Sequence, residues 1–465
     1  MITIDWTPLL NFINFVSYAP SYAVYYYLLV HGGWFVVVIG FYHLFLSFYI
    51  LNRITSYMVA KYKWAYLAVD VPKGNEQTPK AVESIFSHLA GAHKDPDMEE
   101  AVLDGYLQPW FSLEIISIEG YVQFVVATLK KYRDLIEAAI YAQYPEAEIT
   151  EIEDYTKDFP THFPNKDYNL WGTEYVFTNP EESYPIKTYT DFEHSGAEDV
   201  FKDPLAALLE TFSRLGKGEF VGLQILVKPI SNKWHDWKKH GLEVVKKMTG
   251  ATVKQKESNM YKVGSIPGKI FDTALSTITG VQADQKADSK KDDLPSLMLH
   301  LPPGFKTDIE KVERKISKIC FATKIRCIYL AKKESYSKNR IAYGTTGAIK
   351  QFITENLNGL KPEFEKVGTH THYYLKETRL NWRKTKLVNA YMARSRWKGI
   401  PEYLMNTEEL ATLWHFPMLT VRAPMVAMAE AKKGQPPSGL PTERANAIIT
   451  PLTRKSVTPP SNLPI

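Results

Sequence analysis

The sequence predicts an α+β protein that is attached to a membrane by a single N-terminal helix. Three observations support this fold class: an uncharged apolar run of 24 residues near the N-terminus, short strands alternating with amphipathic helices from residue 64 onwards, and a proline-rich C-terminal segment. The chain has 465 residues, enough for two or three domains, and its 56 basic and 51 acidic residues indicate a nearly balanced surface. The two cysteines, Cys320 and Cys327, lie in a predicted core segment, so they imply neither a disulfide framework nor a thiolate metal site.

The membrane span is predicted over residues 28–51, where the sequence contains no Asp, Glu, Lys or Arg. About 20 apolar residues suffice to cross a bilayer as a helix, and no basic region precedes the run as it would in a signal peptide. Lys and Arg are absent from residues 1–27, whereas Arg53 and Lys61 follow the run. The positive-inside rule therefore places the short N-terminal segment outside the cell and the body in the cytoplasm. We expect a single-pass protein of the inner membrane, in contact with the lipid bilayer.

Residues 60–156 are predicted to form a ferredoxin-like unit, in which strands and helices follow in the order βαββαβ. Strands are expected at 64–71, on both sides of a turn at Glu119–Gly120 within 111–127, and at 147–155. A first helix begins at Thr78–Pro79 and a second covers 129–144, and both have apolar side chains at helical spacing.

A second ferredoxin-like unit is predicted over residues 171–335, because the same order of elements recurs. Its strands are expected at 173–179, 219–230, 297–301 and 324–330, and its helices after Asp203–Pro204 and over 309–320. An insertion at 231–293 interrupts the unit and ends in a polar stretch that is typical of disordered segments. A basic helical region, 336–430, and a proline-rich tail, 431–465, complete the predicted organisation.

The sequence does not predict an enzyme. The glycine-containing stretches at 264–270 and 344–348 lack the spacing and the Lys-Ser/Thr pair of a phosphate-binding loop. His370 and His372 would share one face of a strand, but no Cys or carboxylate nearby completes a metal-binding set. We therefore expect no catalytic residue, no metal and no cofactor.

The segment 376–398 is strongly basic, with eight Lys or Arg residues against one acid, Glu377. Three interpretations are open: an amphipathic helix that packs Leu387, Tyr391 and Met392 inward, a contact with the DNA backbone, or a contact with anionic lipid or an acidic protein. The candidate binding residues are Arg379, Arg383, Lys384, Lys386, Arg394, Arg396 and Lys398.

Residues 406–417, NTEELATLWHFP, predict a short helix that begins with a capping box of Asn406 and Glu409 and stops at Pro417. The tail then contains two related phrases, PPSGLP at 436–441 and PPSNLP at 459–464. Such a helix and an extended linker suit the groove of a partner protein. The candidate docking residues are Leu413, Trp414, Phe416 and Pro417. An ordinary helix followed by a disordered tail is the alternative.

Over about residues 376–441, and in the position of its membrane span, the sequence resembles the region that precedes the motor domain in type IV secretion coupling proteins of the HerA/FtsK-like class. The resemblance implies a role in conjugation-like DNA transfer. The 465 residues contain no Walker motif, so we expect the motor ATPase to be a separate polypeptide that this protein tethers to the membrane without catalysis. The alternative function is a membrane-tethered nucleic-acid-binding protein that acts through 376–398. An enzyme with an unrecognised site is a weaker third alternative, and a homo-oligomer is left open.

Overall fold

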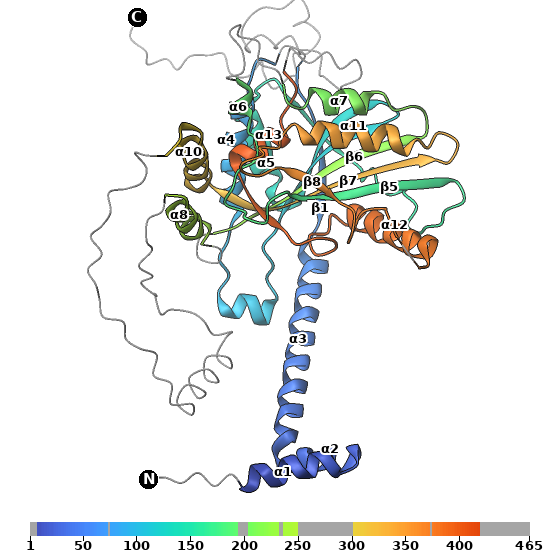
Figure 1. Cartoon of the computed structure of the whole chain (residues 1–465). Helices are drawn as coiled ribbons and strands as arrows, with labels where there is room; N and C mark the ends of the chain where they lie inside the picture. The colour runs from blue at the N-terminus through green and yellow to red at the C-terminus, as the bar shows by residue number, and fades with distance from the viewer. Residues whose placement is uncertain are drawn as a thin grey trace, which may run out of the picture.

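A computed structural model describes residues 7–72, 75–193, 203–231, 236–249, 301–372 and 374–418 of the chain. Within these ranges an antiparallel sheet flanked by helices forms a body, and one long helix projects from it (Figure 1). The predicted α+β class is confirmed. The predicted strand at 297–301, apart from its last residue, and the proline-rich tail lie outside the described residues.

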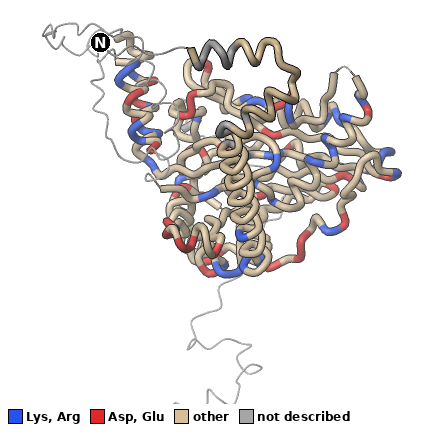
Figure 2. Tube along the Cα trace, turned by 90° about the horizontal axis from the view of Figure 1, so that it is seen from below, with Lys and Arg blue, Asp and Glu red and all other residues tan. Residues whose placement is uncertain are grey.

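The N-terminal region is helical throughout. It consists of α1 (Thr7–Tyr18), α2 (Ser21–Leu28), a π-helical turn (Leu29–Gly33) and α3 (Trp34–Lys61). Among the described residues, the single stretch that is long and apolar enough to cross a membrane is Val37–Lys61, with a mean hydropathy of 1.5. No part of its most apolar window is buried against the rest of the chain. This stretch overlaps the C-terminal part of the predicted span, and α1 and α2 carry no acidic or basic residue (Figure 2).

The body contains nine strands and nine helices within the described residues. The strands are β1 (Trp64–Asp70), β2 (Phe111–Ile118), β3 (Tyr121–Leu129), β4 (Glu148–Ile152), β5 (Tyr168–Phe177), β6 (Glu219–Pro229), β7 (Cys320–Lys332), β8 (Leu360–Glu363) and β9 (Tyr403–Asn406). The helices are α4 (Pro79–Leu89), α5 (Arg133–Gln143), α6 (Tyr189–Glu193), α7 (Ala206–Ser213), α8 (Trp237–Met248), α10 (Pro303–Ser317), α11 (Lys338–Lys350), α12 (Lys376–Met392) and α13 (Thr407–Leu413). Short helical turns lie at Ala90–Ala92, Glu100–Asp104 and Lys130–Tyr132.

The strands form one sheet in the order β4-β1-β3-β2-β6-β7-β5-β8, and the short β9 pairs with one end of β7. Neighbouring strands are antiparallel. The two halves meet where β2 pairs with β6, from Phe111 opposite Val227 to Ile118 opposite Phe220. Outward from this seam, one half of the sheet runs β2, β3, β1, β4 and the other runs β6, β7, β5, β8. Counted along the chain within each half, both orders are second, third, first and fourth strand.

The first half contains the predicted elements in the predicted order, β1-α4-β2-β3-α5-β4. The hairpin turn lies at Glu119–Gly120, where both residues have positive φ angles of 52° and 91°. Backbone atoms of Ser213 and Leu215 would contact a Cβ at residue 120 within 3 Å, so glycine is required there. The apolar side of α4, which includes Val82 and Phe86, is buried as expected.

The second half departs from the prediction after β6. The segment 324–330 was expected to be the closing strand, but it belongs to β7, which pairs with both β5 and β6 and is therefore central. After β7 the chain forms α11, and then β8, which pairs with β5 at the edge of the sheet. The helix expected at 309–320 is α10, which packs instead against α8. The spacing of apolar residues in α10 predicted that one face of this helix is buried, but it could not predict that α8 covers that face.

Helices cover both faces of the sheet. On one face, α4, α5, α7, α11 and α13 enclose the larger core with the strands. On the other face, α12 covers a smaller core through Leu387, Val388 and Tyr391. Within the predicted region 336–430, α11 packs against α7, β8 pairs with β5, and α12 and α13 lie on opposite faces of the sheet.

Candidate functional site

The helix that carries the candidate docking residues, α13, begins with the predicted capping box. The Asn406 side chain accepts a hydrogen bond from the backbone N–H of Glu409 at 2.8 Å, and Glu409 Oε2 accepts one from the backbone N–H of Asn406 at 2.9 Å. Both side chains are buried. Two backbone donors at the start of the helix are thereby satisfied within the protein interior.

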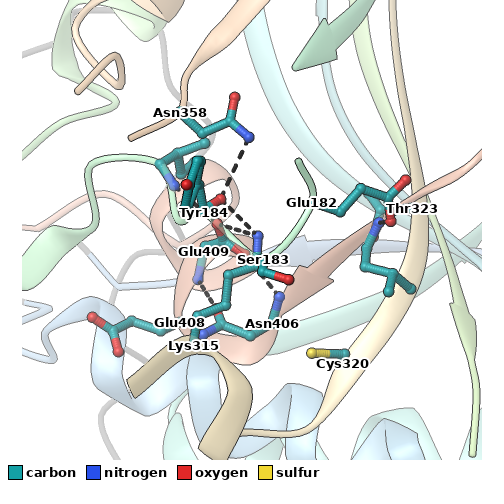
Figure 3. Close-up of polar contacts among 12 residues, drawn as sticks. Glu182, Ser183, Tyr184, Lys315, Cys320, Thr323, Asn358, Asn406, Glu408 and Glu409 are labelled. Atoms are coloured by element: carbon teal, nitrogen blue, oxygen red, sulfur yellow. Dashed lines mark hydrogen bonds and ion pairs between the residues drawn. The ribbon is translucent and has the colours of Figure 1, made fainter. Parts of the chain in front are cut away.

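The second oxygen of Glu409 ties α13 to α10. Glu409 Oε1 accepts a hydrogen bond from the backbone N–H of Ile186 at 3.0 Å and lies 3.0 Å from Lys315 Nζ (Figure 3). Lys315 also donates to the carbonyl oxygen of Tyr184 at 3.2 Å. Because the Lys315 and Glu409 side chains are only 3% and 0% exposed, each charge depends on the other for compensation.

The neighbouring Glu408 connects α13 to the end of α10 and, through Lys318, to α4. Its carboxylate lies 2.7 Å from Lys318 and 2.8 Å from Arg314, at the C-terminal end of α10. Lys318 also pairs with Glu83 of α4, in the first half, at 2.6 Å. Burial on its own raises the pKa of Glu408, but hydrogen bonds from Lys318 and Thr188 and the two positive charges lower it below its ordinary value. The polar side of α13 therefore connects this helix to α10 and, through Lys318, to α4.

The candidate docking residues lie inside the body. Leu413, Trp414 and Phe416 are each 1% exposed and belong to the larger core. The Trp414 ring packs 5.9 Å from Phe124 of β3, measured between ring centroids. Pro417 is also buried, and its carbonyl oxygen accepts a hydrogen bond from Asn75 at 3.1 Å. In the folded chain its own first half covers these four residues, so they are not exposed for contact with a partner.

A buried pair fixes the end of α13 to the residues before α7. His415 Nε2 lies 3.0 Å from Asp203 Oδ1, and His415 Nδ1 lies 2.9 Å from the carbonyl oxygen of Ala411. Burial on its own raises the pKa of Asp203. The charge and hydrogen bond of His415, with backbone N–H groups of Leu205 and Met418, instead lower that pKa below its usual value.

We expect this pair to make stability fall in acid. A carboxyl group whose pKa is lower in the folded state stabilises the fold above its unfolded pKa, about 3.9, and that contribution disappears as the pH falls through the folded pKa. The free energy of unfolding of Asp203→Asn, measured with urea, should therefore be below wild type at neutral pH and approach it below about pH 4. Glu153→Gln, at a side chain that is 87% exposed, is the matched control and should show little difference at either pH. A constant deficit for Asp203→Asn across this range would contradict the prediction.

Four of the seven candidate basic residues are buried or half-buried and make internal contacts. Arg394 is 1% exposed and pairs with Glu114 of β2 and Asp154, at 3.1 and 3.0 Å. The other three bind neighbouring groups of the body: Lys384 donates to Asn169 at 2.6 Å, Arg396 pairs with Glu402 at 2.7 Å, and Arg383 donates to the carbonyl oxygens of Phe364 and Gly368. The seven candidate residues therefore do not form one exposed basic surface. As in the first interpretation, Leu387 and Tyr391 pack inward and Met392 is half-buried, but Lys384 and Arg394 are buried and not solvated.

The remaining basic residues face solvent together with two tryptophans. We call Arg379, Trp382, Lys386, Trp397 and Lys398 the outer stripe; all five are exposed. Trp382 and Trp397 are 57% and 51% exposed, and Lys386 Nζ lies 3.7 Å from the centre of a Trp382 ring. Arg379 also donates a hydrogen bond to the carbonyl oxygen of His372 at 3.0 Å. This combination of cations and aromatic rings is the part of the basic segment that is exposed to contact with another molecule.

The histidine pair predicted on a strand lies in a loop instead. The rings of His370 and His372 are 4.3 Å apart, but neither residue belongs to a strand. Within the described ranges, no group of three or more His, Cys, Asp or Glu side chains is arranged to hold a metal ion.

A pocket of about 330 Å³ lies between α8, α10 and residues 180–183. Its lining includes Lys315, which is already paired with Glu409, and His240, which lies 3.0 Å from Glu181. Burial raises the pKa of the Cys320 thiol in this wall to about 12, so the thiol is protonated and a poor nucleophile at neutral pH. The charged groups Lys315 and His240 in the pocket wall are thus already paired with acidic side chains of the protein.

Sequence reasoning missed an aromatic junction where α3 meets the body. Tyr62, directly after α3, donates a hydrogen bond to the carbonyl oxygen of Leu107 at 2.8 Å, and its ring lies 5.5 Å from Trp110. The Trp110 ring also contacts Trp64 at 5.6 Å and Trp397 at 5.2 Å. The contact between Trp110 and Trp397 joins positions almost 300 residues apart, so local sequence patterns could not reveal it.

The fold and these sites define an α+β protein with a seamed, two-part antiparallel sheet and one candidate membrane-spanning helix. The chain belongs to the family described as a domain of unknown function, DUF8128, whose model matches residues 72–429. Comparison with curated proteins gives no match.

Proposed function

We propose that this protein is a membrane-anchored, non-catalytic component of a conjugation-like, type IV secretion-like DNA-transfer apparatus, in which it tethers a motor ATPase to the inner membrane. The observation that carries the proposal is the firm attachment of the body to α3. Only Tyr62 and Lys63 separate α3 from β1. A body mounted so closely on a membrane helix is suited to hold a partner at a fixed position beside the bilayer.

A second contact between α3 and the body strengthens this attachment. The guanidinium of Arg53, on α3, donates a hydrogen bond to the carbonyl oxygen of Leu103. Gly105 follows the same turn with a φ of 71°, and a Cβ there would collide with the backbone of Arg53. The helix is thereby held at two levels, by the turn Glu100–Asp104 and by the aromatic junction at Tyr62. Two contacts along one helix restrict its swivelling more than a single flexible linker would.

We also infer that each half of the sheet is a ferredoxin-like unit. The orders β4-β1-β3-β2 and β8-β5-β7-β6 both place the fourth strand beside the first and the third beside the second. The element orders β1-α4-β2-β3-α5-β4 and β5-α7-β6-β7-α11-β8 both follow βαββαβ, if α8 and α10 are treated as an insertion. This assignment moves the end of the second unit from 335 to about 363.

The burial of Trp414 and Phe416 shifts the proposed docking segment further along the chain. Beyond residue 418 the sequence contains the two phrases PPSGLP and PPSNLP, and proline-rich stretches of this kind bind partner grooves in an extended form. We propose that residues 434–465 contact the motor, while the N-terminus lies outside and the body lies in the cytoplasm, as the basic residues after the span favour.

The proposal predicts that an ATPase is recovered with the full-length protein by pull-down from native membranes. Deleting 434–465 should abolish that recovery without changing the unfolding transition of the body. The matched control keeps the length of the chain and replaces both six-residue phrases with Gly and Ser. This variant should also lose the ATPase. The tether is excluded if no ATPase accompanies the full-length protein, or if all three forms retain it equally.

A further inference from the structure

We propose that the outer stripe of α12 and its following loop binds the anionic headgroups of the membrane that α3 enters. The proposal rests on the membrane anchor in the proposed function and adds a second point of contact between body and bilayer.

The outer stripe points away from the sheet. Leu387, Val388 and Tyr391 are buried and pack onto the sheet face. Arg379, Trp382 and Lys386 follow one another at intervals of three and four residues, so they share one side of the helix, and all three are exposed. At about 100° per residue, this side lies opposite the buried one. The stripe therefore faces outward from the body.

The stripe also lies on the side of the body from which α3 projects. Trp397 contacts the ring of Trp110, and Trp110 contacts Tyr62, which directly follows the last residue of α3. In Figure 1, α12 and the loop after it lie on the lower side of the sheet, where α3 leaves the body, whereas α7 and α11 lie on the upper side. A face directed away from the sheet on this side is directed towards the bilayer.

The composition of the surface suits an anionic bilayer. The exposed charges of α12 and its following loop are Lys376, Arg379, Lys386 and Lys398 against the single acid Glu377. Each basic residue near an anionic membrane surface contributes about 1 kcal/mol of attraction. Tryptophan side chains such as Trp382 and Trp397 favour the headgroup level because the ring is apolar and the indole N–H is polar. A duplex bound to the same stripe would have to occupy the space between body and bilayer, so the position favours lipid over DNA.

Two buried ion pairs hold the stripe in place. Arg326, which pairs with Glu174, donates to the carbonyl oxygens of Ser395 and Lys398 at 3.1 and 3.0 Å. Arg394 pairs with Glu114 of the first half. The loop that carries Trp397 is thus fixed to both halves of the sheet, so little conformational entropy is lost when it binds a surface.

The test uses the full chain in lipid nanodiscs with an environment-sensitive dye at a single introduced cysteine. Ala393→Cys places the dye at the exposed end of α12 without removing a basic or aromatic residue, and the native Cys320 and Cys327 are buried. A lipid with a headgroup-level quencher should quench this dye in an equal mixture of phosphatidylcholine and phosphatidylglycerol, and much less in phosphatidylcholine alone. Adding Arg379→Glu and Lys386→Glu removes two attractive charges, so the ratio of membrane-bound to unbound stripe should fall by about 30-fold or more.

Two further labels separate the alternatives. Tyr343→Cys, exposed on α11 on the opposite face, should remain unquenched in both lipids. Leu44→Cys, exposed on α3, should be quenched by a lipid with a quencher deep in the acyl chain, which tests the anchor itself. Quenching of the dye at position 44 without quenching of the dye at position 393 would overturn this inference, but it would not contradict the proposed tether. A dye at 393 that responds to duplex DNA at near-physiological salt, and not to either lipid, would overturn it in favour of nucleic acid.

Discussion

The Glu174→Ala variant is expected to lose about 3–5 kcal/mol of its free energy of unfolding, because it leaves the guanidinium of Arg326 buried without its counter-ion. Both side chains are fully buried, and Arg326 Nη2 lies 2.6 Å from Glu174 Oε1. Glu174 Oε2 also accepts a hydrogen bond from the backbone N–H of Ile400 at 2.7 Å. Since whole domains are stable by about 5–15 kcal/mol, urea unfolding of the full chain in detergent should reveal a large shift.

A surface ion pair provides the control. Glu137 pairs with Arg133 at 2.6 Å, but these side chains are 27% and 40% exposed. Glu137→Ala should therefore cost less than about 1 kcal/mol. Replacing both Glu174 and Arg326 with Met should recover part of the loss, because the uncompensated charge is then removed. Equal unfolding midpoints for Glu174→Ala and Glu137→Ala would show that the buried pair is not important for stability.

The Trp414→Ala variant is expected to destabilise the body by about 3–5 kcal/mol, since it empties a large site in the core. The Trp414 ring packs 5.1 Å from Phe416 and 5.9 Å from Phe124, measured between ring centroids. Its indole Nε1 is buried and has no hydrogen-bond partner among the residues that the structure describes. Trp414→Phe should therefore cost much less than Trp414→Ala, because it keeps an aromatic ring and removes the unsatisfied donor.

Trp382→Ala is the matched control, because this tryptophan belongs to the outer stripe and is 57% exposed. Its free energy of unfolding should stay within about 0.5 kcal/mol of wild type. The comparison also distinguishes a core role from a docking role for Trp414. If Trp414→Ala unfolded at the wild-type urea concentration, the residue would not be part of the core and the docking hypothesis would be reopened.

The first half of the sheet could be predicted closely because its signals are local. Pro79 at the first turn of α4, the turn at Glu119–Gly120 and the spacing of Val82 and Phe86 each depend on neighbouring residues alone. The capping box of Asn406 and Glu409 was found for the same reason. These features report secondary structure, and the structure confirms them.

The second half and the docking site required information about partners in space. Ile309, Val312 and Ile316 have the spacing of a buried helix face, but nothing in that spacing says that α8 covers it. The closing strand β8 has only four residues and no alternation of polar and apolar side chains, so it could not be recognised. An aromatic cluster such as Trp414 and Phe416 looks the same whether it packs on its own chain or on another, and the same holds for basic side chains that turn out to neutralise buried acids.

The seam between β2 and β6 has a consequence for the synthesis of the chain. Residues 119–218, a stretch of 100, separate the two strands. At about 5–20 residues per second, the ribosome needs roughly 5–20 s to reach β6 after β2 is complete. During that interval β2, whose side chains are almost all buried in the finished sheet, has an edge without its partner. An unpaired edge is a template for association with other chains, so the nascent first half is exposed to wrong association until β6 has been made.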